Sequence, residues 1–161
     1  MIVSNASPLI NLSRIGKIDL LYSLFGTLMV PAAVWNEVVV EGQGFPGAEL
    51  VRSCSWITKG EVKNIPLVQT LQQELDAGEA EAIVMALEMK ADLLLMDERL
   101  GRETAQHLGI QCLGVIGILT EAKRRKLIDQ VKPLVLALRD LAGFRISQAL
   151  FDRVMADLGE A

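Results

Sequence analysis

The sequence predicts an α/β fold in which an open parallel sheet carries helices on both faces. Short apolar runs alternate with longer amphipathic segments, and strands that alternate with helices usually pair in parallel. Apolar residues make up 51% of the chain but aromatic residues only 4%, so the core is aliphatic, as in a sheet buried on both faces. A chain of 161 residues fits one compact domain. We therefore expect a single domain over residues 1–161, with its core in 1–128 and a helical extension in 129–161.

Five runs have the length and composition of buried strands. They are Ile2–Ser4, Thr27–Val30, Trp56–Thr58, Leu93–Met96 and Gln111–Leu113. Helix-length patterns separate these runs, and three more follow the last one. The predicted helices are Pro8–Arg14, Ile18–Phe25, Pro31–Val40, Ala48–Ser53, Leu67–Leu75, Glu79–Met89, Arg102–Leu108, Val115–Lys126, Val131–Leu141 and Ser147–Leu158. Pro8 and Pro31 are predicted to be first helical residues, and the glycine-rich segment 41–47 is predicted to be a loop.

Composition excludes several classes of protein. No apolar run approaches the roughly 20 residues that span a bilayer, and the N-terminus lacks the pattern of a secretion signal. Cys54 and Cys112 lack metal-type spacing, so reduced thiols and a cytoplasmic protein are expected. The net charge of −4 argues against a surface that attracts nucleic acid everywhere. It leaves open a nuclease whose clustered carboxylates bind cations.

Other hydrolytic chemistries lack the residues that they need. His107 is the only histidine, which disfavours a histidine zinc site and a Ser-His-Asp triad. Neither of the common glycine-rich phosphate loops occurs. Carboxylates that hold a hard divalent cation remain the most economical chemistry.

Topology predicts where such carboxylates would gather. In an open parallel sheet, functional groups lie beyond the carboxyl ends of the strands. Asn5 follows the first predicted strand and Asp97 follows the fourth. Asp97 has an alternative interpretation as the N-cap of the next helix.

Two glutamates have mainly apolar neighbours on their predicted helices. Glu37 is the only charged residue between Val30 and Val40, and the alternative is a solvated side chain at the rim of the buried face. Glu79 begins an apolar stripe, whereas Glu81 is expected on the exposed face. For Glu79 the alternative is a capping box with Asp76.

Four segments resemble PIN-domain proteins. They are IVSNASPLINLSRIGKIDLL, VPAAVWNEV, LDAGEAEAIVMALEMKADLLLMDERLGR and LGIQCLGVIGILTEAKRRKLI. The likeness covers most of residues 1–128, and it is closest to an uncharacterised bacterial branch of predicted nucleic-acid-binding proteins related to VapC-type toxin ribonucleases. The tail GFRISQALFDRVMADLGE looks like the usual ending of that branch. The resemblance implies a five-stranded parallel sheet, Mg²⁺ or Mn²⁺ as cofactor, cleavage of single-stranded RNA, and frequently a partner antitoxin.

The family's four acidic positions fall on Asn5, Glu37, Glu79 and Asp97, and its strand-one serine falls on Ser7. The spacing between Glu79 and Asp97 is the most specific part of the match. Asn5 is a departure, because an Asn oxygen can ligate a hard cation but brings no charge to it.

The sequence thus predicts a metal-dependent ribonuclease in which Glu37, Glu79 and Asp97 are catalytic and bind metal together with Asn5. Ser7, Arg99 and Arg102 are predicted to contact RNA. The alternative is a PIN-like module that binds RNA or protein without cleaving, and neutral Asn5 favours it. Apolar residues on the last two predicted helices also lead us to expect a homodimer.

Overall fold

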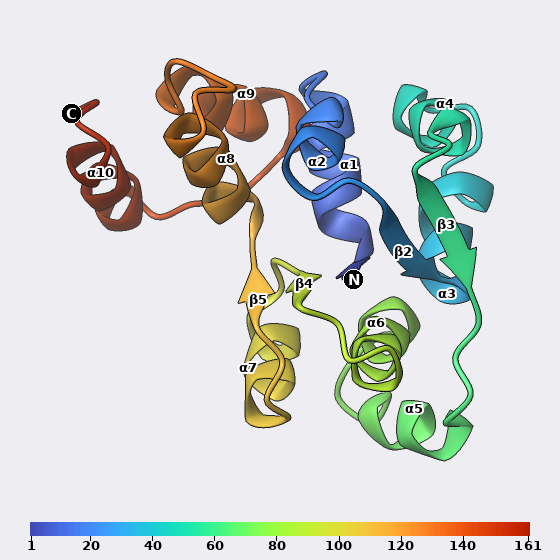
Figure 1. The fold of residues 1–161 in the computed structure, drawn as a ribbon. Helices are drawn as coiled ribbons and strands as arrows, with labels where there is room; N and C mark the ends of the chain where they lie inside the picture. Colours follow the sequence, from blue (N-terminus) through green and yellow to red (C-terminus); the bar gives the residue numbers. More distant parts are fainter.

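The computed structural model describes all residues, 1–161, and contains one parallel sheet with the strand order β3-β2-β1-β4-β5 (Figure 1). The strands are β1 (Ile2–Ser4), β2 (Leu28–Pro31), β3 (Ile57–Gly60), β4 (Leu93–Leu95) and β5 (Cys112–Leu113). Ile2 pairs with Leu28 on one side and with Leu93 on the other. The strand β1 is therefore central, and the order of strands reverses beside it. The predicted fold class is confirmed.

Helices occupy the intervals between strands and the whole C-terminal part (Figure 1). They are α1 (Ala6–Arg14), α2 (Asp19–Phe25), α3 (Ala32–Trp35) with the π-helical turn η1 (Asn36–Val40), α4 (Pro46–Ser53), α5 (Ile65–Leu71), α6 (Ala77–Glu88), α7 (Arg99–His107), α8 (Val115–Arg124), α9 (Lys132–Ala142) and α10 (Gln148–Asp157). No helix is both long enough and apolar enough to cross a membrane.

Two apolar cores lie on opposite faces of the sheet. The larger core joins 22 buried residues, mainly from α1, α2, η1, α8 and α9. The smaller core joins 10 residues, mainly from α6, β4 and the end of α7. Successive side chains of a strand point into opposite cores. On β4, Leu95 belongs to the larger core and Leu94 to the smaller. Aliphatic side chains fill both layers, as the composition indicates.

Several predicted boundaries are corrected by local capping. The first helix begins at Ala6 rather than Pro8, because extended Asn5 is its N-cap and proline is tolerated throughout a first turn. Pro31 ends β2 instead of opening a helix. Asn64 accepts a hydrogen bond from Leu67 N and so starts α5 earlier than predicted. Extended Glu98 starts α7 at Arg99 instead of Arg102.

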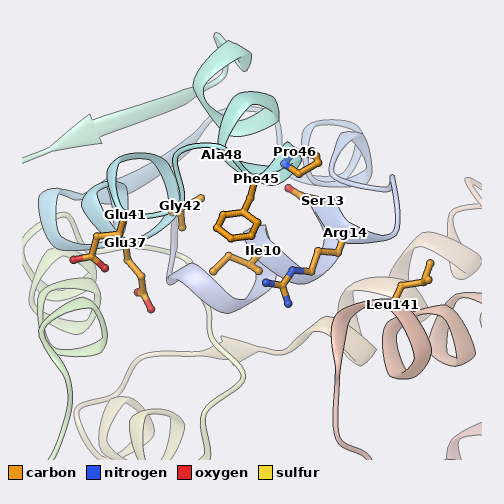
Figure 2. Close-up of a pocket in the computed structure, with 12 residues that line it drawn as sticks. Ile10, Ser13, Arg14, Glu37, Glu41, Gly42, Phe45, Pro46, Ala48 and Leu141 are labelled. Atoms are coloured by element: carbon orange, nitrogen blue, oxygen red, sulfur yellow. The ribbon is translucent and has the colours of Figure 1, made fainter.

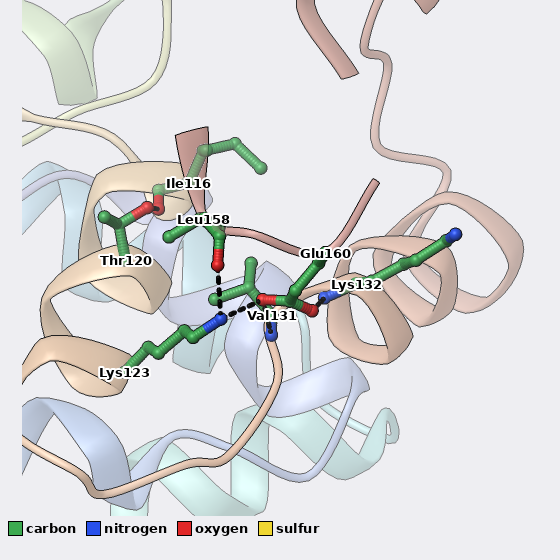
Figure 3. A network of polar contacts seen from close by, with 7 residues as sticks. All are labelled: Ile116, Thr120, Lys123, Val131, Lys132, Leu158 and Glu160. Carbon is green, nitrogen blue, oxygen red and sulfur yellow. Dashed lines mark hydrogen bonds and ion pairs between the residues drawn. The ribbon is translucent and has the colours of Figure 1, made fainter. Parts of the chain in front are cut away.

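The C-terminal helices pack on the same domain, and a buried glutamate holds the chain end (Figure 3). The Glu160 carboxylate, 5% exposed, accepts from Lys123 Nζ at 2.8 Å. It also accepts from the backbone N–H groups of Val131 and Lys132, at 2.9 and 2.8 Å. Lys123 Nζ donates in addition to Leu158 O. These contacts lower the pKa of Glu160, although its burial acts the other way.

Most of the apolar residues predicted to form a dimer interface pack within the chain. Val135 and Leu138 of α9 are buried, and Phe151 and Val154 of α10 pack against the larger core. Leu141 remains 66% exposed. The homodimer therefore stays a prediction, and less apolar surface is exposed for its interface than the sequence pattern indicated.

We expect Glu160→Gln to destabilise the fold by about 2 kcal/mol, because an amide N–H₂ would replace one of the two accepting oxygens and none of the three donors would then have a charged acceptor. Glu103→Gln is the matched control, since Glu103 pairs with Arg99 on the surface, where the two side chains are 49% and 92% exposed. Chemical denaturation at neutral pH measures both. Equal effects of the two substitutions would contradict this account of the chain end.

Candidate functional site

Asn5 lies at the centre of the carboxyl edge of the sheet, directly after β1. It is 3% exposed, and its backbone N–H donates to Leu95 O, which extends the pairing of β1 with β4. Its side-chain Nδ2 donates to Glu98 Oε2 at 2.9 Å. The Oδ1 atom is buried and receives no hydrogen bond. A buried carbonyl oxygen without a donor is costly unless a cation or another donor meets it.

Glu98 joins the ends of β1 and β4. Its Oε2 accepts from Asn5, and its Oε1 accepts from the hydroxyl of Ser7. Sequence reasoning missed this residue because it considered only the first of two adjacent acids after β4. The pair Asp97–Glu98 carried the available signal, since neighbouring residues in extended backbone project to opposite sides.

Glu37 approaches Asn5 from η1, and Gly78 of α6 separates them. A Cβ atom on Gly78 would lie 3.2 Å from Glu37 Oε2 and 3.5 Å from Asn5 Oδ1. Both oxygens therefore border the space that this glycine leaves open. Partial burial raises the pKa of Glu37 first, and the nearby Asp76, Glu98, Glu41 and Glu79 carboxylates raise it further.

Asp97 follows β4 and contacts the segment that follows β5. Its Oδ1 accepts from Val115 N at 2.9 Å, at the first residue of α8. Its Oδ2 is buried and has no hydrogen-bond partner. Burial raises the pKa of Asp97 to about 6, Glu98 adds to the rise, and the bond from Val115 and the charge of Arg102 oppose it. The interpretation of Asp97 as the N-cap of α7 is wrong, because its carboxylate meets α8 and Glu98 holds the cap position.

Glu79 forms the capping box that was its alternative interpretation. Its Oε2 accepts from Asp76 N, and its own N–H donates to Asp76 Oδ1. Burial is the main reason that its pKa is raised; the hydrogen bond from Asp76 N opposes the rise, and the charges of Asp76 and Glu98 add to it. Glu79 thus caps the N-terminus of α6 and also lies close enough to Glu98 for the two charges to interact.

The prediction that Glu81 is exposed is wrong. Its side chain is half-buried, and Oε1 accepts from Ala33 N in the first turn of α3. Met85, one turn further along the same helix face, is 2% exposed. The cause is that α3 and α5 both pack against α6, which a helical pattern taken alone does not reveal.

The predicted RNA-contacting residues have different environments. Ser7 is engaged with Glu98. Arg99 forms an ion pair with Glu103 on the surface. Arg102 lies by Asp97, since a Cβ atom on Gly114 would be 2.7 Å from Asp97 Oδ1 and 3.0 Å from Arg102 Nη1. Arg102 is therefore beside Asp97, at the carboxyl edge of the sheet that also carries Asn5, Glu37 and Glu98 and that we call the acidic edge.

The donor set suits a hard cation, although no compact metal cluster is formed. Two buried side-chain oxygens, Asn5 Oδ1 and Asp97 Oδ2, lack hydrogen bonds, and carboxylate and amide oxygens are the ligands that Mg²⁺ and Mn²⁺ prefer. Groups of three or more His, Cys, Asp or Glu close enough to hold one ion are absent. The predicted carboxylates Glu37, Glu79 and Asp97 thus do not form such a group as the side chains stand.

The carboxylates therefore gather at the switch in strand order, which is the place where an open parallel sheet binds its ligands. A family model described as a PIN domain matches residues 1–160, and the chain belongs to that family. PIN domains are generally nucleases that use divalent metals. No curated protein matches the chain.

The raised pKa of Asp97 predicts a pH-dependent stability in the absence of metal. The folded protein holds this proton more tightly than the unfolded chain, so its contribution to stability is complete below about pH 4. That contribution is lost as the pH rises through about 6. Asp97→Asn removes the titration and keeps an acceptor for Val115 N. We expect the variant to match wild type near pH 4 and to exceed it by about 2 kcal/mol at pH 8. Denaturation across this range in EDTA measures the difference, and a constant difference would mean that Asp97 titrates normally.

Proposed function

We propose that the protein is a divalent-metal-dependent nuclease that hydrolyses phosphodiester bonds of single-stranded RNA. The observation that carries the proposal is the meeting of Asn5 and Glu37 beside Gly78, with Glu98 hydrogen-bonded to Asn5 and Asp97 following the neighbouring strand. Membership of the PIN family supports the nuclease class. Single-stranded RNA as substrate rests on the resemblance to toxin ribonucleases.

The residues divide into ligands and residues that position them. Asn5, Glu37 and Asp97 present the oxygens best suited to hold Mg²⁺ or Mn²⁺, with Glu79 at the rim of the group. When bound, such an ion acts as a Lewis acid, lowers the pKa of a coordinated water and offsets charge on the phosphate. Glu98 fixes the amide of Asn5 by accepting from Nδ2, which leaves Oδ1 directed to the open space. Ser7 holds Glu98 in turn.

The chain supplies positive charge at one side of this acidic edge. Arg102 lies beside Asp97, and a guanidinium there suits a phosphate oxygen of the bound strand. Arg99 is 92% exposed and can leave Glu103 at little cost, because exposed ion pairs are weak. We therefore assign both arginines to the RNA backbone and reassign Ser7 from RNA contact to the support of Glu98.

A role as a VapC-like toxin with an antitoxin partner belongs to the same proposal and rests on the resemblance. The homodimer rests on the apolar residues of the last two helices, and a cytoplasmic location rests on the cysteine spacing and the N-terminal sequence. The second candidate is a PIN module that binds RNA without cleaving it. Neutral Asn5 favours this alternative, because one negative ligand is missing where the family has an acid.

Substitution of the carboxylates tests the proposal. We expect Glu37→Gln, Glu79→Gln and Asp97→Asn each to reduce Mn²⁺-dependent cleavage of single-stranded RNA at least about a hundredfold, because each removes a charge that holds the ion. Glu98→Gln should reduce it less, about tenfold, because a glutamine retains an acceptor for Asn5. Single-turnover cleavage of labelled RNA measures all four.

Glu81→Gln is the matched control, since glutamine keeps an acceptor for Ala33 N at a position outside the predicted ligand set. It should cleave like wild type. A wild-type protein that binds RNA in Mn²⁺ but leaves it intact would favour the binding module. Equal losses in Glu79→Gln and Glu81→Gln would show that Glu79 is the wrong ligand.

A further inference from the structure

A pocket of about 500 Å³ adjoins the acidic edge and shares Glu37 with it (Figure 2). Side chains from α1, η1, α4 and α9 line it, together with the loop before α4. Its apolar lining includes Ile10, Phe45 and Leu141, and its polar lining includes Arg14, Glu37 and Glu41. A ligand that reaches Glu37 from this side therefore occupies the pocket as well.

The two most exposed large apolar side chains of the protein both line this pocket. Phe45 and Leu141 are each 66% exposed. The other three phenylalanines, Phe25, Phe144 and Phe151, pack against the larger core. Phe45 alone among them presents its ring to solvent. Together with Leu141 it gives the pocket exposed apolar surface, and such surface in a pocket is typical of a binding site.

The loop holds Phe45 in this exposed position. Its N–H donates to Gly42 O and its carbonyl accepts from Ala48 N. A Cβ atom on Gly42 would lie 2.3 Å from Val38 O, so only glycine fits the turn that precedes the ring. The Phe45 backbone is therefore fixed before any ligand arrives, and little conformational entropy is lost when the ring is covered.

The polar groups around the ring match a nucleotide. Figure 2 shows the Arg14 side chain on one side of Phe45 and the carboxylates of Glu37 and Glu41 on the other. Arg14 is exposed and makes only a long contact, 3.4 Å, from Nη1 to Ala142 O, so it is free to meet a phosphate. An aromatic face stacks on any base, and carboxylates accept from the amino groups of adenine, cytosine and guanine. Uracil presents two carbonyls beside its single N–H, and these would be repelled.

We propose that this pocket, bounded by Phe45, Arg14 and Glu37, is a subsite for one base of a single-stranded RNA, with a preference for bases that carry an amino group. The proposal rests on the proposed function, because the base in this pocket would belong to the RNA strand whose phosphate lies at the acidic edge. Stacking on Phe45 supplies the affinity, and Glu37 and Glu41 supply the preference.

Binding of fluorescein-labelled homopolymers of adenosine, cytidine and uridine, measured by fluorescence anisotropy, tests the proposed subsite. The measurements are made in a Ca²⁺ buffer, and gels check that the RNA stays intact. Phe45→Ala should weaken adenosine and cytidine binding about tenfold or more, and Phe45→Trp should restore it. Tyr22→Ala is the control, because Tyr22 is another largely exposed aromatic, 55% exposed, whose ring lies against Trp56 outside the pocket. Phe45→Ala should unfold near the wild-type temperature, since Phe45 contributes little to the core.

The outcomes separate the subsite from the nuclease. Phe45-dependent binding by a wild type that does not cleave RNA supports the subsite and contradicts the proposed function. Cleavage by wild type with unchanged affinity in Phe45→Ala supports the function and overturns the subsite. Unchanged RNA affinity is also the result expected if a partner protein fills the pocket. A wild-type protein that binds no RNA overturns the subsite. A wild-type protein that binds the uridine polymer as tightly as the adenosine polymer overturns the base preference.

Discussion

The hydrogen bond from Asn5 Nδ2 to Glu98 Oε2 is the contact on which the rest of the site depends. It joins the ends of two neighbouring strands at the point where the order of strands reverses. Glu98 uses its second oxygen on Ser7, so Asp97 is left to meet α8. The same bond turns Asn5 Oδ1 toward Gly78 and Glu37. One amide thus determines which oxygens face one another across the edge.

The arrangement favours ligand binding at the expense of apo stability. Three of its carboxyl groups, Glu37, Glu79 and Asp97, have raised pKa values, mainly through burial and partly through mutual repulsion. Two buried oxygens have no donor. A fold selected only for stability would have paired these groups, whereas a site that receives a cation needs them unpaired. The neutral Asn5 relieves part of this repulsion. An ionised aspartate in its place would have no N–H to donate to Glu98, and the two carboxylates would repel each other.

Periodicity and topology predicted the fold well and the site in part. All five strands were located to within one or two residues, because buried parallel strands are short apolar runs between turn signals. The same topology correctly put Asn5 and Asp97 near the carboxyl edge. Glu98 and Glu81 were missed because their roles depend on partners distant in sequence: Glu98 meets β1 and α1, and Glu81 meets the first turn of α3. Helical patterns assign a residue to a face of its own helix but not to a neighbour that covers that face. The pocket beside Phe45 was equally invisible, since it is assembled from four helices and a loop.

The most direct test of this account is the thermal unfolding of wild type and Asn5→Asp, each in EDTA and in Mn²⁺. If Asn5 Oδ1 borders a cation site, the added carboxylate repels Glu98 and Glu37 in the absence of metal and binds the ion more tightly in its presence. We predict a lower unfolding temperature in EDTA and a larger Mn²⁺-induced rise for the variant, since a bound ion stabilises the folded state by mass action. A Mn²⁺-induced shift that is the same in both proteins would place Asn5 outside any metal site and contradict the account.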